Sequence, residues 1–405
     1  MFKKSLAYLI LNYFIQFINI ALNLVFMKYL SPFQMGSLAL ARTWQQLVDY
    51  AHLGTRYSLD RYIPVTHDEE RLRLVASVLI FTAFSASVVF IVALISSAND
   101  VTVTSLTLCG VGISLGNIIK CYYRASNRIN EMLKLVVKCQ LIPVLIPLLL
   151  YLIEHSWNMY IYSSVICYLF TITSLLYHER TILKVLNFNS FFSTLKSIIS
   201  SSLWLFINAI FIFLYLVMDR FFINHTLGRD ALGEYSIITF AFTALMIIPS
   251  TCAELLFVKV IRESCTAGKI LFIKEVMIIF CVTIVGVVAA NILMGYFIHN
   301  YTNYGTLVSR MHIATLAVIP FTFTSIYYHV MNGLDFRKQL VVVNGSLCLG
   351  LAIYYILPVI MSYQVSIDYY LYAKLTTGWL IIVGYIICIG YYQLFKRKAF
   401  EDVKS

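Results

Sequence analysis

Residues 122–137 read YYRASNRINEMLKLVV, and residues 327–342 read YYHVMNGLDFRKQLVV. Six of the sixteen aligned positions are identical, namely Tyr122/Tyr327, Tyr123/Tyr328, Asn127/Asn332, Leu135/Leu340, Val136/Val341 and Val137/Val342. Near the start of each half, Leu30 and Gly36 match Leu227 and Gly233 in the same way. Repeats about two hundred residues apart indicate an internally duplicated chain, which is how many secondary transporters are built.

The composition is that of a membrane protein. Of the 405 residues, 60% are hydrophobic and 12% are charged, and the mean hydropathy is +0.82. Because soluble domains carry about 25% charged residues, an ordinary soluble fold is excluded. Apolar runs near twenty residues predict membrane spans at residues 5–27, 36–55, 74–96, 101–123, 133–153, 159–177, 198–218, 235–258, 276–298, 311–331, 340–361 and 375–395. We expect an all-α polytopic protein with about twelve transmembrane helices in two six-helix lobes.

Positive charge predicts how the chain is oriented. With the N-terminus inside, 24 of the 30 lysines and arginines lie at or near the cytoplasmic side. This asymmetry follows the positive-inside rule and predicts that both chain ends are cytoplasmic. The net charge of +11 is then mostly a topology signal, and no nucleic-acid partner is predicted. The expected domains are an N-terminal lobe at 1–183, a cytoplasmic linker at 184–197 and a C-terminal lobe at 198–405.

The sequence contains no signature of catalysis. Its nine cysteines are scattered singly, without a C-x-x-C spacing, so neither a disulfide framework nor a metal site is indicated. A Walker-type glycine loop and a nucleophile–base arrangement are also missing. We therefore predict no catalytic residue, no metal, no cofactor and no enzyme activity.

The first span carries a stripe of amides. Asn12, Gln16, Asn19 and Asn23 are separated by four, three and four residues, so they share one helix face. Such amides either join packed helices by hydrogen bonds or line a hydrophilic cavity. The length of the stripe favours a cavity.

The second span is unusually polar, with Arg42, Gln45, Gln46 and Asp49. Arg42 lies roughly 9 Å inside the outer end, at 1.5 Å per residue. An arginine at such depth costs about 3 kcal/mol unless it reaches water, an anion or a partner. Two interpretations stay open, a salt bridge to Asp219 of the seventh span and a positive charge offered to an anionic headgroup. The geometry of a guanidinium, which can donate two hydrogen bonds to phosphate oxygens, favours the anionic headgroup.

In the second half, Asn208 and Asp219 are expected to line the same cavity. Asp49 and Glu254 are the acids best placed for proton or sodium coupling, or else they are structural partners. Three cations lie near outer helix ends, where they are expected to reach lipid headgroups, namely Arg220, Arg310 and Lys374.

Two phrases resemble a known family. Residues 29–64 read YLSPFQMGSLALARTWQQLVDYAHLGTRYSLDRYIP, and residues 218–236 read MDRFFINHTLGRDALGEYS. The first resembles the second-helix signature of Wzx-type O-antigen and polysaccharide flippases of the multidrug/oligosaccharidyl-lipid/polysaccharide superfamily, carried by Leu30, Gly36, Leu53, Gly54, Arg61, Tyr62, Ile63 and Pro64. The second resembles the junction of that family's seventh and eighth helices, carried by Asp219, Arg220, Leu227, Gly228, Gly233 and Tyr235.

The resemblance implies a MATE-like fold of two lobes around a central cavity, with Arg42 as a cationic cavity residue. It implies a flippase that translocates undecaprenyl pyrophosphate-linked O-antigen repeat units across the bacterial inner membrane by alternating access, in lipopolysaccharide biosynthesis. The implied partners are the lipid-linked oligosaccharide, the lipid bilayer and other polysaccharide-assembly membrane proteins.

Two alternatives remain. A MATE-like drug or metabolite antiporter would favour acidic cavity residues, which Arg42 and the amide stripe do not match. A membrane polysaccharide polymerase would need a sizeable outer loop for its catalytic groups, and the predicted outer connections near 219–234 and 299–310 are short.

Overall fold

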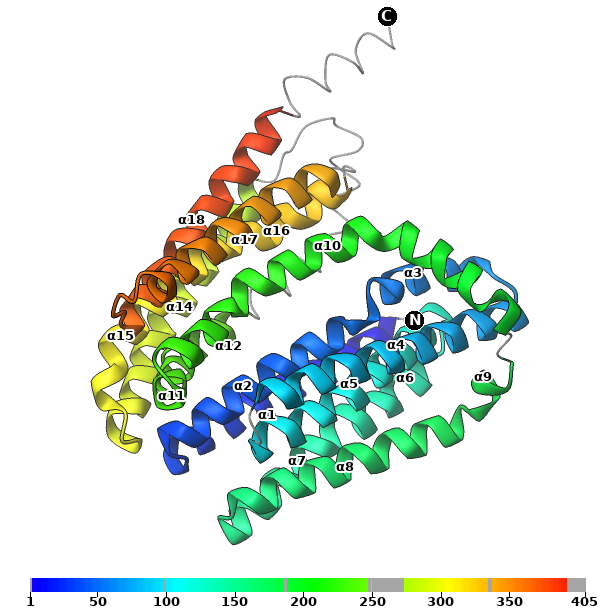
Figure 1. Ribbon diagram of the computed structural model, residues 1–405, viewed down its shortest axis with the longest axis horizontal. Helices are drawn as coiled ribbons and strands as arrows, with labels where there is room; N and C mark the ends of the chain where they lie inside the picture. Colours follow the sequence, from blue (N-terminus) through cyan, green and yellow to red (C-terminus); the bar gives the residue numbers. More distant parts are fainter. Residues whose placement is uncertain are drawn as a thin grey trace, which may run out of the picture. The chain divides into compact units, whose positions relative to one another are not determined.

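A computed structural model describes residues 2–97, 100–185, 188–246, 249, 273–333 and 337–391. In these ranges every regular element is a helix and none is a strand (Figure 1). Ten of the described helices are long and apolar enough to cross a membrane. The all-α polytopic prediction is therefore confirmed. Of the two other expected spans, 36–55 is too polar to qualify by hydropathy, and 235–258 lies partly outside the described residues.

The chain forms two compact units. Unit 1 comprises Met1–Phe26 and Ser37–Phe206, and unit 2 comprises Met27–Gly36 and Ile207–Ser405. The elements of the first half are α1 (Phe2–Tyr29), α2 (Pro32–Asp49), η1 (Tyr50–His52), α3 (Thr55–Tyr62), η2 (Ile63–Val65), α4 (Asp68–Ser96), α5 (Val101–Ala125), α6 (Ile129–Val136), η3 (Val137–Leu141), α7 (Ile142–Glu154), α8 (Trp157–His178) and α9 (Arg180–Lys184). Helix α10 (Phe188–Thr226) contributes to both units.

Unit 1 is built around α5, which packs against α4 and α8, while α7 packs along α8 (Figure 1). Asp100 caps the start of α5, because its Oδ1 accepts hydrogen bonds from the backbone N of Thr102 at 2.9 Å and of Val103 at 3.2 Å. Its Oδ2 accepts a bond of 2.9 Å from Ser37 Oγ at the start of α2. One carboxylate therefore sets the start of α5 against the start of α2.

The second predicted span is broken near its C-terminal end. Helix α2 ends at Asp49, and Leu53 and Gly54 both have left-handed backbone, with φ of 44° and 88°. Gly54 lies directly against α10, since a Cβ there would be 2.9 Å from both Ser202 Oγ and Phe206 Cβ. Only glycine tolerates this combination of positive φ and close packing. The break redirects the chain into α3.

The fifth span is irregular at its middle. Between α6 and α7 the chain makes one π-helical turn, η3, and Pro143 is the second residue after it. Proline lacks a backbone N–H and cannot bond to the carbonyl four residues earlier, so a change of helical register at this point is expected. Such turns occur frequently at functional sites.

Unit 2 contains the second part of α10, then α11 (Arg229–Ile238), α12 (Phe240–Leu245), α14 (Ile273–Tyr301), η4 (Gly305–Leu307), α15 (Val308–Leu316), α16 (Val318–Gly333), α17 (Arg337–Ile360) and α18 (Ile367–Tyr391). Helix α16 packs against α14 and α18, and α17 packs against α18. The 39 residues of α10 correspond to about 58 Å of helix along its axis, roughly twice the hydrocarbon thickness of a bilayer. This helix includes most of the stretch 184–197 that was expected to be a linker.

Gly36 and Gly233, the glycines that match between the two halves, meet in unit 2. A Cβ on Gly36 would overlap the carbonyl oxygen of Arg229, and a Cβ on Gly233 would overlap the carbonyl oxygen of Pro32. Each carbonyl lies four residues before the opposite glycine, so the crossing of α2 and α11 is symmetric. The two helix backbones touch here, because neither glycine carries a side chain.

Candidate functional site

Arg42 of α2 is half-buried and is held by the amide stripe of α1. Its Nη1 donates a hydrogen bond to Oδ1 of Asn23. The Asn23 Nδ2 in turn donates to the backbone carbonyl of Asn19, at 2.6 Å. The carboxamide of Asn23 is thereby oriented with its oxygen toward the guanidinium. The guanidinium is thus fixed against α1 inside unit 1.

A pocket of about 110 Å³ lies beside Arg42 within unit 1. Its walls come from α1, α2, α5, α7 and α8, and its polar lining consists of Asn19, Arg42, Gln45, Tyr160, Ser164 and Tyr168. Of the described residues that line it, Arg42 alone carries a charge. One water needs about 10–15 Å³ by this measure, so the pocket has room for several waters or for one small anionic group.

The neighbouring helices shape this pocket. Gln45 Nε2 donates to the backbone carbonyl of Leu106 in α5, at 2.6 Å, which fixes the amide at the wall. Pro143, the second residue after the π-helical turn, also lines the pocket.

The α8 contribution escaped the sequence analysis. Tyr160, Ser164 and Tyr168 are spaced by four residues, so they share one helix face, and all three line the pocket. That spacing was visible in the sequence. It went unnoticed because tyrosine and serine at helical spacing are common in packed spans.

The rest of the predicted polar set lies elsewhere in unit 1. Asn12 is half-buried, whereas Gln16 and Gln46 are exposed, and none of the three lines the pocket. Asp49 is paired: its Oδ2 lies 2.9 Å from Arg56 Nη1, and its Oδ1 accepts a bond of 2.9 Å from Asn117 Nδ2.

The neighbouring carboxylate keeps the guanidinium of Arg56 positively charged. Burial alone would lower the pKa of Arg56, but the carboxylate of Asp49 outweighs it and raises the pKa above the usual guanidinium value. Asp49 therefore already has a charged partner in this structure. Its role as a coupling acid stays a prediction.

In unit 2, Asp219 pairs with Lys374, and its pairing with Arg42 stays a prediction. The distance from Lys374 Nζ to Asp219 Oδ2 is 2.6 Å, and the hydroxyl of Tyr235 donates to the same oxygen. The side chain of Lys374 is 4% exposed and that of Asp219 is 1% exposed. The expectation that Lys374 reaches lipid headgroups is therefore wrong, because its ammonium is enclosed by α10, α11 and α18.

Asn208 also lies in the interior of unit 2. Its Oδ1 accepts a hydrogen bond of 2.5 Å from Asn344 Nδ2, and Tyr385 donates its hydroxyl to Asn344 Oδ1 at 3.2 Å. This chain of polar groups joins α10, α17 and α18, which is what interhelical amides do in membranes. A place for Asn208 on a cavity wall stays a prediction. Glu254, the other expected coupling acid, lies outside the described residues.

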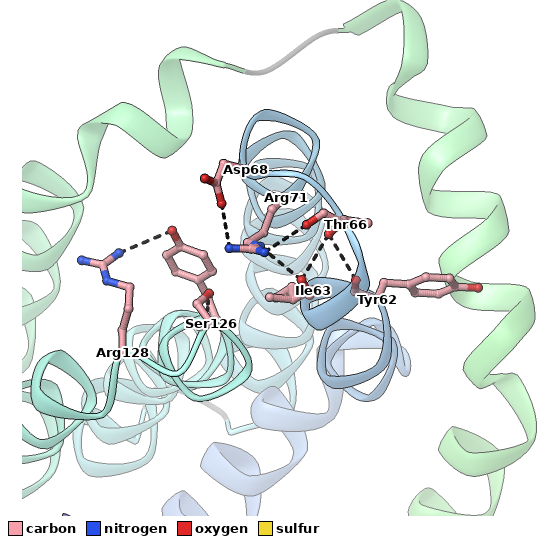
Figure 2. A network of polar contacts seen from close by, with 8 residues as sticks. Tyr62, Ile63, Thr66, Asp68, Arg71, Ser126 and Arg128 are labelled. Atoms are coloured by element: carbon pink, nitrogen blue, oxygen red, sulfur yellow. Dashed lines mark hydrogen bonds and ion pairs between the residues drawn. The ribbon is translucent and has the colours of Figure 1, made fainter. Parts of the chain in front are cut away.

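The end of unit 1 that we predict to be cytoplasmic is rich in arginine pairs. Figure 2 shows Arg71 bonding to Asp68, Thr66 and Ile63. Its guanidinium donates to Asp68 Oδ1 at 2.8 Å, to the Thr66 carbonyl at 2.9 Å and to the Ile63 carbonyl at 3.1 Å. One side chain thereby fixes the turn between α3 and α4.

Two further pairs join distant segments at this end of unit 1. Arg124 of α5 forms a two-nitrogen contact with the carboxylate of Asp60 in α3. Arg128 lies 3.7 Å from Glu179, which also accepts a hydrogen bond from the Tyr123 hydroxyl. These contacts stabilise unit 1 and leave few arginines there for other anions.

The fold is shared with known transporters. The chain is similar to the lipid II flippase MurJ in an inward closed conformation, with a TM-score of 0.68 and 12% identity over 95% of this chain and 87% of that one. It is similar to an inward-facing multidrug resistance MATE family transporter of the MOP superfamily, with a TM-score of 0.62 and 13% identity over 96% of both chains. A eukaryotic MATE transporter, AtDTX14, has a TM-score of 0.60 and 14% identity over 96% of this chain and 94% of that one.

No family model matches the sequence, and no curated protein matches it. Identities this low establish a common fold and leave the cargo open. The polytopic architecture inferred from the sequence therefore agrees with that of transporters and flippases of this superfamily.

Proposed function

We propose that this protein is a flippase that moves undecaprenyl pyrophosphate-linked O-antigen repeat units across the bacterial cytoplasmic membrane by alternating access. The observation that supports this proposal most directly is the pocket beside Arg42. Among the described residues of its lining, one guanidinium stands with amides and hydroxyls and no carboxylate. Such a lining attracts anions and disfavours cationic cargo.

The chemistry of the pocket suits one phosphoryl group. A guanidinium binds phosphate oxygens through short, charge-assisted hydrogen bonds, and hydroxyl and amide groups add further donors. The volume of about 110 Å³ is far too small for an oligosaccharide. We therefore assign this pocket to the phosphate end of the headgroup, while the polyprenyl tail stays in the bilayer.

Similarity of fold to a lipid II flippase supports a lipid-linked cargo, since that protein is described as acting on a lipid. A membrane potential that is negative inside would favour the outward movement of an anionic headgroup by about 2.3 kcal/mol per charge per 100 mV. We propose that both chain ends are cytoplasmic and that other polysaccharide-assembly membrane proteins act with this one.

A drug or metabolite antiporter is the second candidate, because two of the similar structures are MATE transporters. The sign of the cargo separates the two. An antiporter for cationic drugs needs acidic groups where they would bind, and Arg42 would repel such cargo.

Reconstitution into liposomes tests the proposal. A fluorescent polyprenyl pyrophosphate carrying a short oligosaccharide is placed in both leaflets, and a membrane-impermeant quencher reports the fraction that moves outward. The proposal predicts movement that depends on the protein and on the pyrophosphate. Equal movement of a neutral polyprenyl glycoside, or transport of a cationic dye without any movement of the lipid, would refute it.

A further inference from the structure

We infer that the ammonium group of Lys374 occupies a cation site of unit 2, in the place that a monovalent metal ion would otherwise take. The inference goes beyond the proposed function and does not depend on it. Its basis is the set of groups around one nitrogen atom inside the membrane-spanning part of unit 2.

Two oxygen atoms accept hydrogen bonds from that nitrogen. The Nζ of Lys374 donates hydrogen bonds to Asp219 Oδ2 at 2.6 Å and to the backbone carbonyl of Leu216 at 2.9 Å. A carboxylate and a backbone carbonyl are the ligands that hard metal cations prefer. The ammonium thus has the surroundings of a bound cation, although it is tethered to α18.

Aromatic rings complete the enclosure. Nζ lies 5.3 Å from the ring centroid of Phe242 and 5.8 Å from that of Tyr235. The faces of aromatic rings attract cations at such distances, whether the cation is an ammonium or a metal ion. Nothing in this set of groups requires the cation to be covalently attached to the chain.

Hydrogen bonds hold the carboxylate in a fixed orientation. Its Oδ2 also accepts the hydroxyl of Tyr235, and its Oδ1 accepts a hydrogen bond of 2.9 Å from the backbone N of Arg220. These bonds would persist if the lysine were shortened. Asp219 would then present its carboxyl oxygens to the space vacated by the ammonium.

Two consequences follow. The wild-type protein carries its own cation in unit 2, so its stability will not distinguish sodium from an organic cation too large to enter. A variant without the lysine amine will leave the Asp219 carboxylate and the Leu216 carbonyl facing an empty space, and sodium or potassium will bind there. A tethered cation and a free one are interchangeable on this view.

The test uses the full-length protein in detergent and measures its melting temperature in sodium chloride, potassium chloride and choline chloride at equal ionic strength. The variants are Lys374→Ala, Asp219→Asn and the double variant. Lys28→Ala serves as the matched control, because it removes an exposed lysine at the end of α1. We expect Lys374→Ala to be stabilised by sodium or potassium over choline by roughly 2–4 °C or more, in a saturable manner. Wild type, the double variant and Lys28→Ala will show no such difference.

Two results would overturn the inference. One is a folded Lys374→Ala protein that melts at the same temperature in all three salts, as it would if Arg220 turned to pair with Asp219. The other is a sodium-specific shift in the wild type that disappears in Asp219→Asn, because the site would then hold a metal ion already. This second comparison remains decisive even if Lys374→Ala does not fold.

Discussion

Replacing either matched glycine by alanine will force α2 and α11 apart. In Gly233→Ala the new Cβ would lie 2.8 Å from the carbonyl carbon of Pro32 and 3.1 Å from the backbone N of Gly36, and it would overlap the Pro32 oxygen. Ordinary van der Waals contacts begin at 3.4 Å, so the carbon alone demands a movement of 0.6 Å, which is 3.4 minus 2.8. The obstacle is backbone, and no side-chain rotation relieves it.

Overpacking of this kind typically costs about 1–3 kcal/mol. We expect about 2–3 kcal/mol for each single substitution, because two helix backbones must separate, and the gain of about 0.5–1 kcal/mol in helix propensity does not offset it. The two costs will not add. One separation makes room for both methyl groups, so the double variant should be less destabilised than the sum by about 1 kcal/mol or more.

Thermal or denaturant-induced unfolding in detergent micelles measures these effects. Gly350→Ala is the control, because no atom lies within 4 Å of a Cβ built on that helical glycine. It should be neutral or slightly stabilising. Single variants within about 0.5 kcal/mol of wild type, or a double variant whose cost equals the sum, would refute the interlocked crossing.

Three other changes have outcomes that the contacts define. Lys374→Met will lower the free energy of unfolding by about 3–5 kcal/mol, because it leaves a buried carboxylate without its cation. The double variant Lys374→Met/Asp219→Asn will recover most of this loss. Equal stabilities of the single and double variants in chemical denaturation would contradict the prediction. Arg42→Ala will slow lipid movement in liposomes by about 10–100-fold, which corresponds to about 1.5–3 kcal/mol for hydrogen bonds to a charged group. The rate of Arg42→Lys will fall between those of Arg42→Ala and wild type. Full activity of both variants would remove Arg42 from the mechanism. Arg71→Met will lower the free energy of unfolding by about 1–3 kcal/mol, because two backbone carbonyls and a carboxylate lose their hydrogen-bond donor. Arg71→Lys will not restore the lost stability. An unchanged melting temperature would show that water replaces those bonds without cost.

Local sequence patterns predicted the architecture well. Three signals can be read without knowing any tertiary contact. They are the apolar runs, the low share of charged residues, and the repeat of Leu30 and Gly36 at Leu227 and Gly233. The all-α polytopic fold follows from them, because a segment that must satisfy its own backbone inside lipid has few options. The interruptions of the second and fifth spans were harder to predict. Gly54 and Pro143 each mark one interruption, but neither residue predicts the direction that the chain takes after it.

Partners between distant segments were out of reach. Lys374 and Asp219 are 155 positions apart, and hydropathy reports how deep a residue lies, without the direction in which its side chain points. Asn208 and Asn344 pair across 136 positions for the same reason. Within the pocket, Asn19, Arg42 and Gln45 were predicted because their polarity stood out against apolar neighbours. Tyr160 and Tyr168 were missed because tyrosine suits both packed and polar surroundings.

In unit 1, several arginines pair with carboxylates, whereas several lysines are exposed. Arg56, Arg71, Arg124 and Arg128 spend their charge on carboxylates of the same unit, whereas the exposed cations include Lys134, Lys138, Lys184 and Lys196. Ions in solution screen exposed charges within about 10 Å at 0.1 M but reach the Arg56–Asp49 pair poorly, because its side chains are only 24% and 25% exposed. Rising salt should therefore weaken the attraction of these lysines for anionic lipids long before it weakens the Arg56–Asp49 ion pair.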